Sequence, residues 1–131
     1  MSTIITKPKV DIAPDLLEEL NMLVQNEGQV VVHCISSAAA TMDYYIRIWP
    51  TTYLFDHHSD HRSELVHVEK ITVAPMWQLV PAGTTAIYSL IFSGLPKSCL
   101  TFDLEEVIPL AGRFSAKNIS RNNQDVYFVR L

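Results

Sequence analysis

The order of hydrophobic and polar positions divides the chain into one helical segment followed by a series of strands. Residues 13–27 have a helical pattern, because apolar side chains from residue 12 onward recur at intervals of four, four and three: Ile12, Leu16, Leu20 and Leu23. Pro14 suits the first turn of this helix, and Gly28 suits the position after its end. Residues 1–12 precede it as an extended arm. We therefore predict one N-terminal α-helix ahead of a β region over residues 29–131.

The β region reads as short runs rich in β-branched and aromatic residues, separated by turn signals. The expected strands are residues 29–35, 44–49, 51–55, 63–73, 84–92, 99–107, 114–119 and 126–131. In the long fourth run, alternation places Leu65, His67, Glu69 and Ile71 on one face. Pro81-Ala82-Gly83 indicates a tight turn with proline at its second position. Many short strands of this kind favour a β-sandwich or a barrel.

Length and composition agree with a single folded domain. The chain has 131 residues, of which 48% are hydrophobic, so disorder is excluded and one core is expected. The net charge of −4 lacks the basic character of a nucleic-acid binder. No run approaches the roughly 20 apolar residues of a membrane-spanning helix, and residues 1–10 contain no signal-peptide core. We expect a cytoplasmic protein with no nucleic-acid or membrane partner.

The two cysteines, Cys34 and Cys99, are expected to be buried, reduced thiols in such a compartment. Their spacing around Trp49 is close to the pattern of antibody domains, in which a disulfide joins two sheets. The tyrosine expected two residues before the second cysteine is replaced by Lys97. The spacing therefore favours the sandwich, and we do not predict the disulfide.

A histidine-rich segment, residues 56–61, contains His57, His58 and His61, whose imidazoles could bind zinc. Adjacent residues of an extended segment point to opposite faces, and the composition is that of a turn. We interpret the segment as a hairpin loop and predict no functional metal site. The alternative is a metal-dependent enzyme or metal-binding protein. It would use at least three of a wider set: His33, His57, His58, His61, His67 and Glu69.

The segment around Arg47 is the most informative candidate for recognition. Ile46 and Ile48 should point one way, which leaves Arg47 between two aromatic side chains on the other face. Arginine beside aromatic rings is enriched in recognition surfaces. We predict an interaction surface made of Tyr45, Arg47, Trp49 and Tyr53. The alternative is a contact within the chain, with the arginine extending to water.

Several motifs resemble a family of small uncharacterised bacterial proteins with an immunoglobulin-like β-sandwich. The matching residues are Ile46-Arg47-Ile48-Trp49-Pro50-Thr51-Thr52-Tyr53-Leu54, Trp77, Gly94-Leu95-Pro96-Lys97-Ser98-Cys99, Phe102-Asp103-Leu104 and Arg121-Asn122-Asn123-Gln124-Asp125-Val126-Tyr127. The resemblance covers residues 29–131. It implies an immunoglobulin-like β-sandwich with one N-terminal helix, and it implies no activity.

No catalytic motif is present in the sequence. There is no glycine-rich phosphate loop, no Gly-x-Ser-x-Gly, no His-Glu-x-x-His and no Cys-x-x-Cys, so we assign no catalytic residue and no cofactor. The first hypothesis is a non-enzymatic domain that binds a protein partner or itself, as a homodimer. The metal-dependent protein described above is the second. The third is a small-molecule binder with a pocket between helix and sheet, which no sequence feature singles out.

Overall fold

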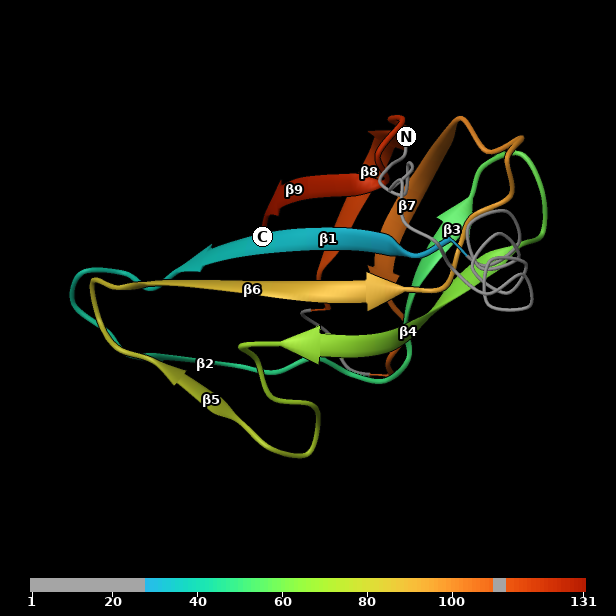
Figure 1. Cartoon of the computed structure of the whole chain (residues 1–131). Helices are drawn as coiled ribbons and strands as arrows, with labels where there is room; N and C mark the ends of the chain where they lie inside the picture. The colour runs from blue at the N-terminus through green and yellow to red at the C-terminus, as the bar shows by residue number, and fades with distance from the viewer. Residues whose placement is uncertain (1–27, 110–112) are drawn as a thin grey trace, which may run out of the picture.

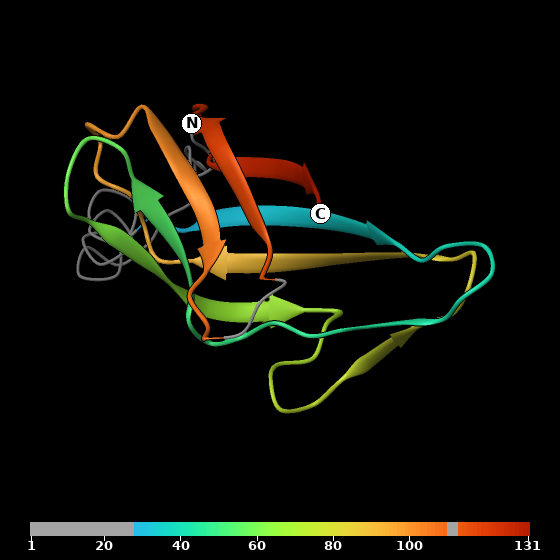
Figure 2. The same cartoon turned by 180° about the vertical axis from the view of Figure 1, so that it is seen from behind.

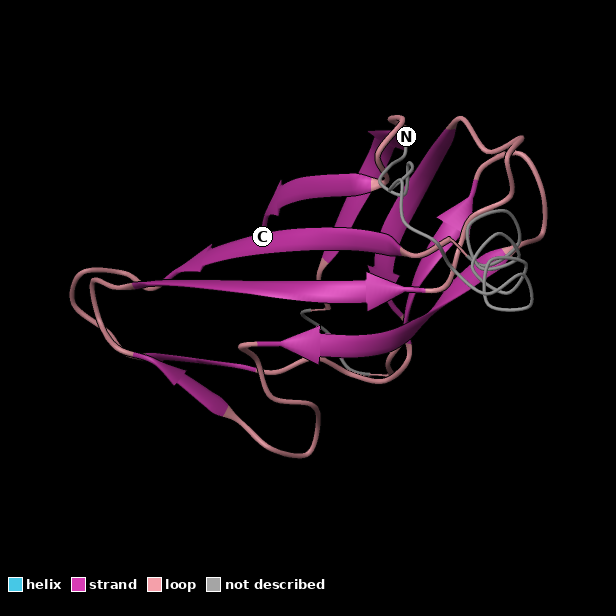
Figure 3. Cartoon of the chain, in the orientation of Figure 1, coloured by secondary structure: helices cyan, strands magenta, loops and turns pink. Residues whose placement is uncertain are grey.

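In a computed structural model of the chain, the structure describes residues 28–109 and 113–131, and these are mostly β (Figure 3). The strands are β1 (Val30–Ser37), β2 (Tyr44–Ile46), β3 (Thr52–Asp56), β4 (Arg62–Glu69), β5 (Gln78–Val80), β6 (Thr85–Phe92), β7 (Thr101–Glu106), β8 (Ser115–Ser120) and β9 (Val126–Arg130). The predicted arm and helix, residues 1–12 and 13–27, lie outside the described residues. Within the described ranges, no helix is long and apolar enough to cross a membrane.

Seven strands form one sheet in the order β8-β7-β3-β4-β6-β1-β9, as Figures 1 and 2 show. All neighbours are antiparallel except β1 and β9, which are parallel. β4 connects the two halves of this sheet, since its start pairs with β3 and the rest pairs with β6. The strands β3, β7 and β8 therefore run across the direction of β1, β6 and β9 (Figure 1).

A register shift between Leu65 and His67 explains the bend of β4 and corrects the predicted alternation. Leu65 and Val68 both pack against the core, whereas Val66 and His67 are exposed. A bulge places one extra residue in a strand, so side chains beyond it change faces. The prediction that Leu65 shares a face with His67 was wrong. His67 and Glu69 do lie together, with Nε2 3.4 Å from Oε2, and both are exposed.

The core lies between the two halves of the sheet. It includes Val30, Val32 and Cys34 of β1, Leu54 of β3, Leu90 and Phe92 of β6, and Phe102 and Leu104 of β7. The rings of Phe102 and Tyr127 meet edge to face at 5.0 Å, which joins β7 to β9 across the core. In β1, β3, β7 and the second half of β6, every second residue is buried, as expected for strands with one buried face.

The strands β2 and β5 form a separate two-stranded ribbon, in which Tyr45 pairs with Leu79. Backbone hydrogen bonds from Ala38 N to Thr84 O and from Gly83 N to Ala39 O hold its base beside β1 and β6. The turn into β6 has Thr84 N bonded to Pro81 O, with Gly83 at φ 76°. Proline is thus the first residue of this turn, which corrects the predicted second position. A left-handed φ at the third position favours glycine.

Cys34 and Cys99 are both buried, and they form no disulfide with each other. Burial raises the pKa of Cys34 to about 12 and the pKa of Cys99 to about 11. The neutral thiol is therefore the form held in the fold, and neither sulfur is activated as a nucleophile.

Candidate functional site

The site begins where β2 ends, at residues 46–49. The side chains of Ile46 and Ile48 are 7% and 1% exposed and belong to the core. Backbone bonds from Ile48 N to Thr72 O and from Ala74 N to Ile48 O fix this segment beside the loop after β4. Because neighbours in an extended chain alternate, Arg47 and Trp49 turn the other way, as the sequence predicted.

The guanidinium group of Arg47 lies between two indole rings, which we call the Arg47–tryptophan cluster: Arg47, Trp49 and Trp77. Its Cζ is 4.9 Å from the ring centroid of Trp49 and 3.8 Å from that of Trp77. The Nη1 group donates to the carbonyl oxygen of Pro75 at 3.1 Å. The Nε atom is buried without a hydrogen-bond partner. Cation–π attraction of this kind holds the plane of the guanidinium in a fixed position.

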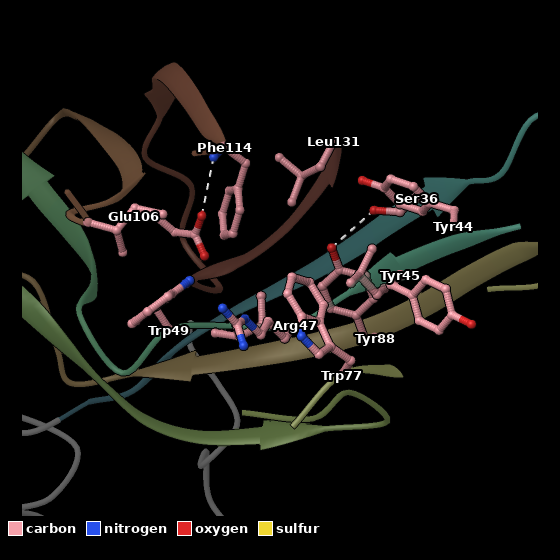
Figure 4. A pocket seen from close by; sticks show the side chains of 13 residues that line it. Ser36, Tyr44, Tyr45, Arg47, Trp49, Trp77, Tyr88, Glu106, Phe114 and Leu131 are labelled. Carbon is pink, nitrogen blue, oxygen red and sulfur yellow. Dashed lines mark hydrogen bonds between the residues drawn. The ribbon is translucent and has the colours of Figure 1, made fainter. Parts of the chain in front are cut away.

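A cavity of about 330 Å³ opens beside this cluster. Figure 4 shows its walls, which come from β2, from the facing ends of β1 and β6, and from the segments that follow β7 and β9. The aromatic residues of the lining are Tyr44, Tyr45, Trp49, Trp77, Tyr88 and Phe114. Mostly apolar walls with a few polar groups are typical of small-molecule sites.

Glu106, the last residue of β7, contributes a carboxyl group that is buried at 4% exposure. Burial raises the pKa of Glu106 above its usual value, although hydrogen bonds from the N–H groups of Phe114 and Trp49 and the charge of Arg47 act against it. The Phe114 N–H lies 3.3 Å from Oε1. Among the residues that the structure describes, Arg47 forms no ion pair, with Glu106 or with any other carboxylate.

Ser36 and Tyr88 form a further polar wall of the cavity. Their hydroxyl oxygens are 3.0 Å apart and hydrogen-bonded, and burial raises the pKa of Tyr88 to about 12. Sequence reasoning missed Trp77, Tyr88, Glu106 and Phe114 as parts of this site. No local sequence pattern identifies them, because they lie on other elements than Arg47 and only the pairing of distant strands brings them beside it.

The fourth residue of the predicted surface, Tyr53, lies elsewhere. It is on β3 and does not line the cavity. The Cζ atom of Arg62 lies over its ring, 4.2 Å from the ring centroid, and the centroid of the Phe55 ring is 5.9 Å away. The structure therefore places Tyr45, Arg47 and Trp49 around the cavity, and places Tyr53 in a different arginine–aromatic contact.

The candidate metal ligands are separated by the fold. His57 Nε2 donates to Asp103 Oδ1 at 2.7 Å, and its Nδ1 is 2.8 Å from Thr101 Oγ1. His61 Nε2 contacts Ser63 Oγ and the carbonyl oxygen of Gly94. Within residues 28–109 and 113–131, no three His, Cys, Asp or Glu side chains form a group that could hold a metal ion.

His58 and His33 make other contacts. The backbone N–H of His58 donates to Asp56 Oδ1 in the turn between β3 and β4. His33 Nδ1 is 2.7 Å from Ser89 Oγ, and the His33 ring is 5.0 Å from that of Phe128. Residues 57–61 form the hairpin loop between β3 and β4, as the sequence predicted for the segment 56–61, except that Asp56 ends β3.

Comparison with known proteins gives no match: no family model, no curated protein and no solved structure corresponds to this chain.

Proposed function

We propose that this chain is a non-enzymatic interaction domain that associates with a second copy of itself through the β2–β5 ribbon. The observation that carries the proposal is a concentration of exposed apolar side chains there. We call the set the ribbon surface, and its members are 45–69% exposed: Met42, Tyr44, Tyr45, Met76, Trp77 and Leu79. Scattered exposed apolar residues are ordinary, but six of them on one short ribbon and its ends are typical of an interaction surface.

The area of the ribbon surface suits one side of a dimer interface. A large side chain has roughly 150–250 Å² of surface, so six that are about half exposed present on the order of 600 Å². A standard interface uses about 800 Å² from each partner. Ordering the neighbouring loops against the second copy would supply the remainder.

A second copy is the occupant because the ribbon surface is nearly free of charge. Each chain carries a net charge of −4, so two copies repel weakly wherever acidic groups face each other. In the ribbon, residues 42–46 and 76–80 include one charged side chain, Asp43, whose Oδ1 accepts the N–H of Ala82. Two identical neutral surfaces can meet about a two-fold axis without like-charge contacts. β5 also has no second strand neighbour among the described strands.

Sedimentation equilibrium over a roughly hundredfold concentration range tests this proposal. The wild-type mass should rise from monomer to dimer. Leu79→Asp should hold the chain as a monomer, because it places two like charges face to face in an apolar contact.

The matched control is Phe128→Asp. Phe128 is 75% exposed on β9, away from the ribbon, so this variant should dimerise as the wild type does. A monomer mass for the wild type at every concentration would reject self-association. A Leu79→Asp variant that stays dimeric and folded would show that another surface is used.

We also propose that the β region is an immunoglobulin-like β-sandwich and that the chain belongs to the bacterial family that it resembles. The bend of the seven-stranded sheet at β4, with one apolar core between its two halves, supports the sandwich. A crystal structure in which β8 pairs with β9 to close a barrel would contradict it.

A cytoplasmic location is a further proposal, supported by two buried cysteines without a disulfide. Thiol titration of protein unfolded without reductant should find two free groups. A disulfide-linked peptide in the digest would contradict it.

A further inference from the structure

We propose that the cavity beside the Arg47–tryptophan cluster binds a small organic anion, with an anionic oxygen group against Arg47 and an apolar body against the aromatic walls. The site does not depend on self-association, because it is formed within one chain. Tyr44, Tyr45 and Trp77 belong to both surfaces, so the three variants that locate the binding replace no residue of the ribbon surface.

The unused donors of Arg47 are the first reason. A guanidinium has five N–H groups, and the structure gives Arg47 one hydrogen bond, from Nη1 to Pro75 O. Among the described residues, Nη2 has no acceptor, and Arg47 lines the cavity (Figure 4). A partly desolvated cation with free donors is stabilised by an acceptor, and the planar guanidinium matches the geometry of carboxylate and phosphate oxygens.

The preorganisation of Arg47 is the second reason. An arginine side chain normally loses rotamer freedom when it binds a ligand. Here the two indole rings already hold the guanidinium, at 4.9 and 3.8 Å from their centroids. The rotamer freedom of Arg47 is therefore lost during folding, so an anion that binds later contacts a donor whose position is already fixed.

The charge balance of the cavity favours an anion. Among the described residues that line it, Arg47 and Glu106 are the only ones with ionisable side chains apart from the tyrosines. Arg47 stays charged at any physiological pH. Glu106 is disfavoured in its ionised form by burial, and its oxygen Oε1 already accepts the Phe114 N–H. The positive charge therefore faces the cavity without a matching carboxylate in contact.

The size and walls of the cavity define the rest of the ligand. Its volume of about 330 Å³ lies at the small end of the range for ligand sites. The flat rings of Trp49 and Phe114 and the side chain of Leu131 form an apolar wall near Arg47. A single ring or a short aliphatic chain that ends in a carboxylate or phosphate fits this chemistry.

Intrinsic fluorescence reports on this site directly, because Trp49 and Trp77 are the only tryptophans in the chain. The full chain is titrated with phenylacetate, hexanoate and phenyl phosphate, and with the uncharged phenylacetamide and the cationic phenethylamine. We expect a saturable change with at least one of the anions and binding at least about tenfold weaker for the amide. A comparison of phenylacetate with phenyl phosphate distinguishes the two anionic groups.

Three variants locate the binding. Arg47→Lys keeps the charge but loses the planar donor pair, so the affinity should fall at least about tenfold. Arg62→Gln is the matched control, because it removes an arginine that stacks on Tyr53 outside the cavity, and it should bind as the wild type does. Glu106→Gln removes the competing negative charge, so anion affinity should stay the same or rise.

Three results would overturn the proposal. They are no saturable response to any of the three anions, equal binding of amide and carboxylate, and loss of anion binding in Glu106→Gln while circular dichroism shows a folded chain. Tighter binding of phenethylamine than of phenylacetate would also overturn it, because the site would then recognise a cation through Glu106. Leu79→Asp should bind the anion normally even as a monomer, so failure of self-association and failure of this site are separate results.

Discussion

Two regions of the molecule have the same kinds of side chain in different surroundings. Beside the cavity, Arg47 lies between two tryptophans near the carboxyl group of Glu106. On the outer face of the sheet, Arg62 of β4 lies over Tyr53 of β3, and Asp103 lies on β7, on the other side of β3. Arg62 is exposed and covers one ring, whereas Arg47 is half-buried and covered by two. The two carboxyl groups differ in the same way.

The comparison shows that burial, more than residue type, decides what these groups do. Asp103 accepts hydrogen bonds from His57 and from the N–H of Asn118, and it forms an ion pair with Lys117. Burial of Asp103 alone would raise its pKa, but hydrogen bonds from Asn118 and His57 lower it below its usual value. Glu106 is more deeply buried with fewer partners, and burial raises its pKa. On the outer face, Asp103 is therefore paired with groups of the same chain. At the cavity, Arg47 and Glu106 form no ion pair with any described residue.

The largest expected difference between the two regions is in the free energy of unfolding that is lost when each arginine is replaced by alanine. Arg47→Ala should lower the free energy of unfolding by about 2 kcal/mol, because a desolvated cation–π contact and the packing of two indole rings are lost. Arg62→Ala should cost less than about 1 kcal/mol, since the contact is exposed. Urea denaturation of both variants measures this. Equal losses would mean that the burial of Arg47 contributes no additional stability.

A second test uses the pH dependence of Glu106. Because its folded pKa lies above the ordinary value of 4.5, the wild-type chain loses stability as the pH rises from 4.5 through the folded pKa. Glu106→Gln has no such loss, so the stability of the variant relative to wild type should increase over that window and then level off. Denaturation at a series of pH values measures the difference. A difference that stays constant with pH would contradict the raised pKa.

The smallest expected effect is the opposite pH dependence at Asp103. Its lowered pKa means that the ionised carboxylate stabilises the fold above the ordinary value of 3.8, and that this contribution is lost as the pH falls through the folded pKa. Asp103→Asn should therefore be less stable than wild type at neutral pH. The difference should be under about 1 kcal/mol, because the group is partly exposed to solvent. The gap should close in acid. A variant as stable as wild type at pH 7 would show that the bonds from His57 and Asn118 add nothing.

Local patterns predicted most of the strands and one face of the site. Alternation over residues 46–49 separates Ile46 and Ile48 from Arg47 and Trp49, and the structure agrees. The turn composition of residues 56–61 likewise predicts a loop, and β3 and β4 flank one there. β5 was not predicted, because a strand of three residues, one of them an exposed leucine, is too short to show an alternation of apolar and polar positions.

By itself, the sequence determined the β character, the alternation of buried and exposed residues, and the solvent-facing loop of histidines, because these depend on residues one to four positions apart. Only the tertiary structure decided the site. The pairing of β2 with β5 brings Trp77 to Arg47, and the end of β7 brings Glu106 to the same cavity. The bulge in β4 exposes Val66 and His67 while Leu65 and Val68 pack on the core. Such contacts depend on long-range strand register, which the periodicity of a single strand does not specify.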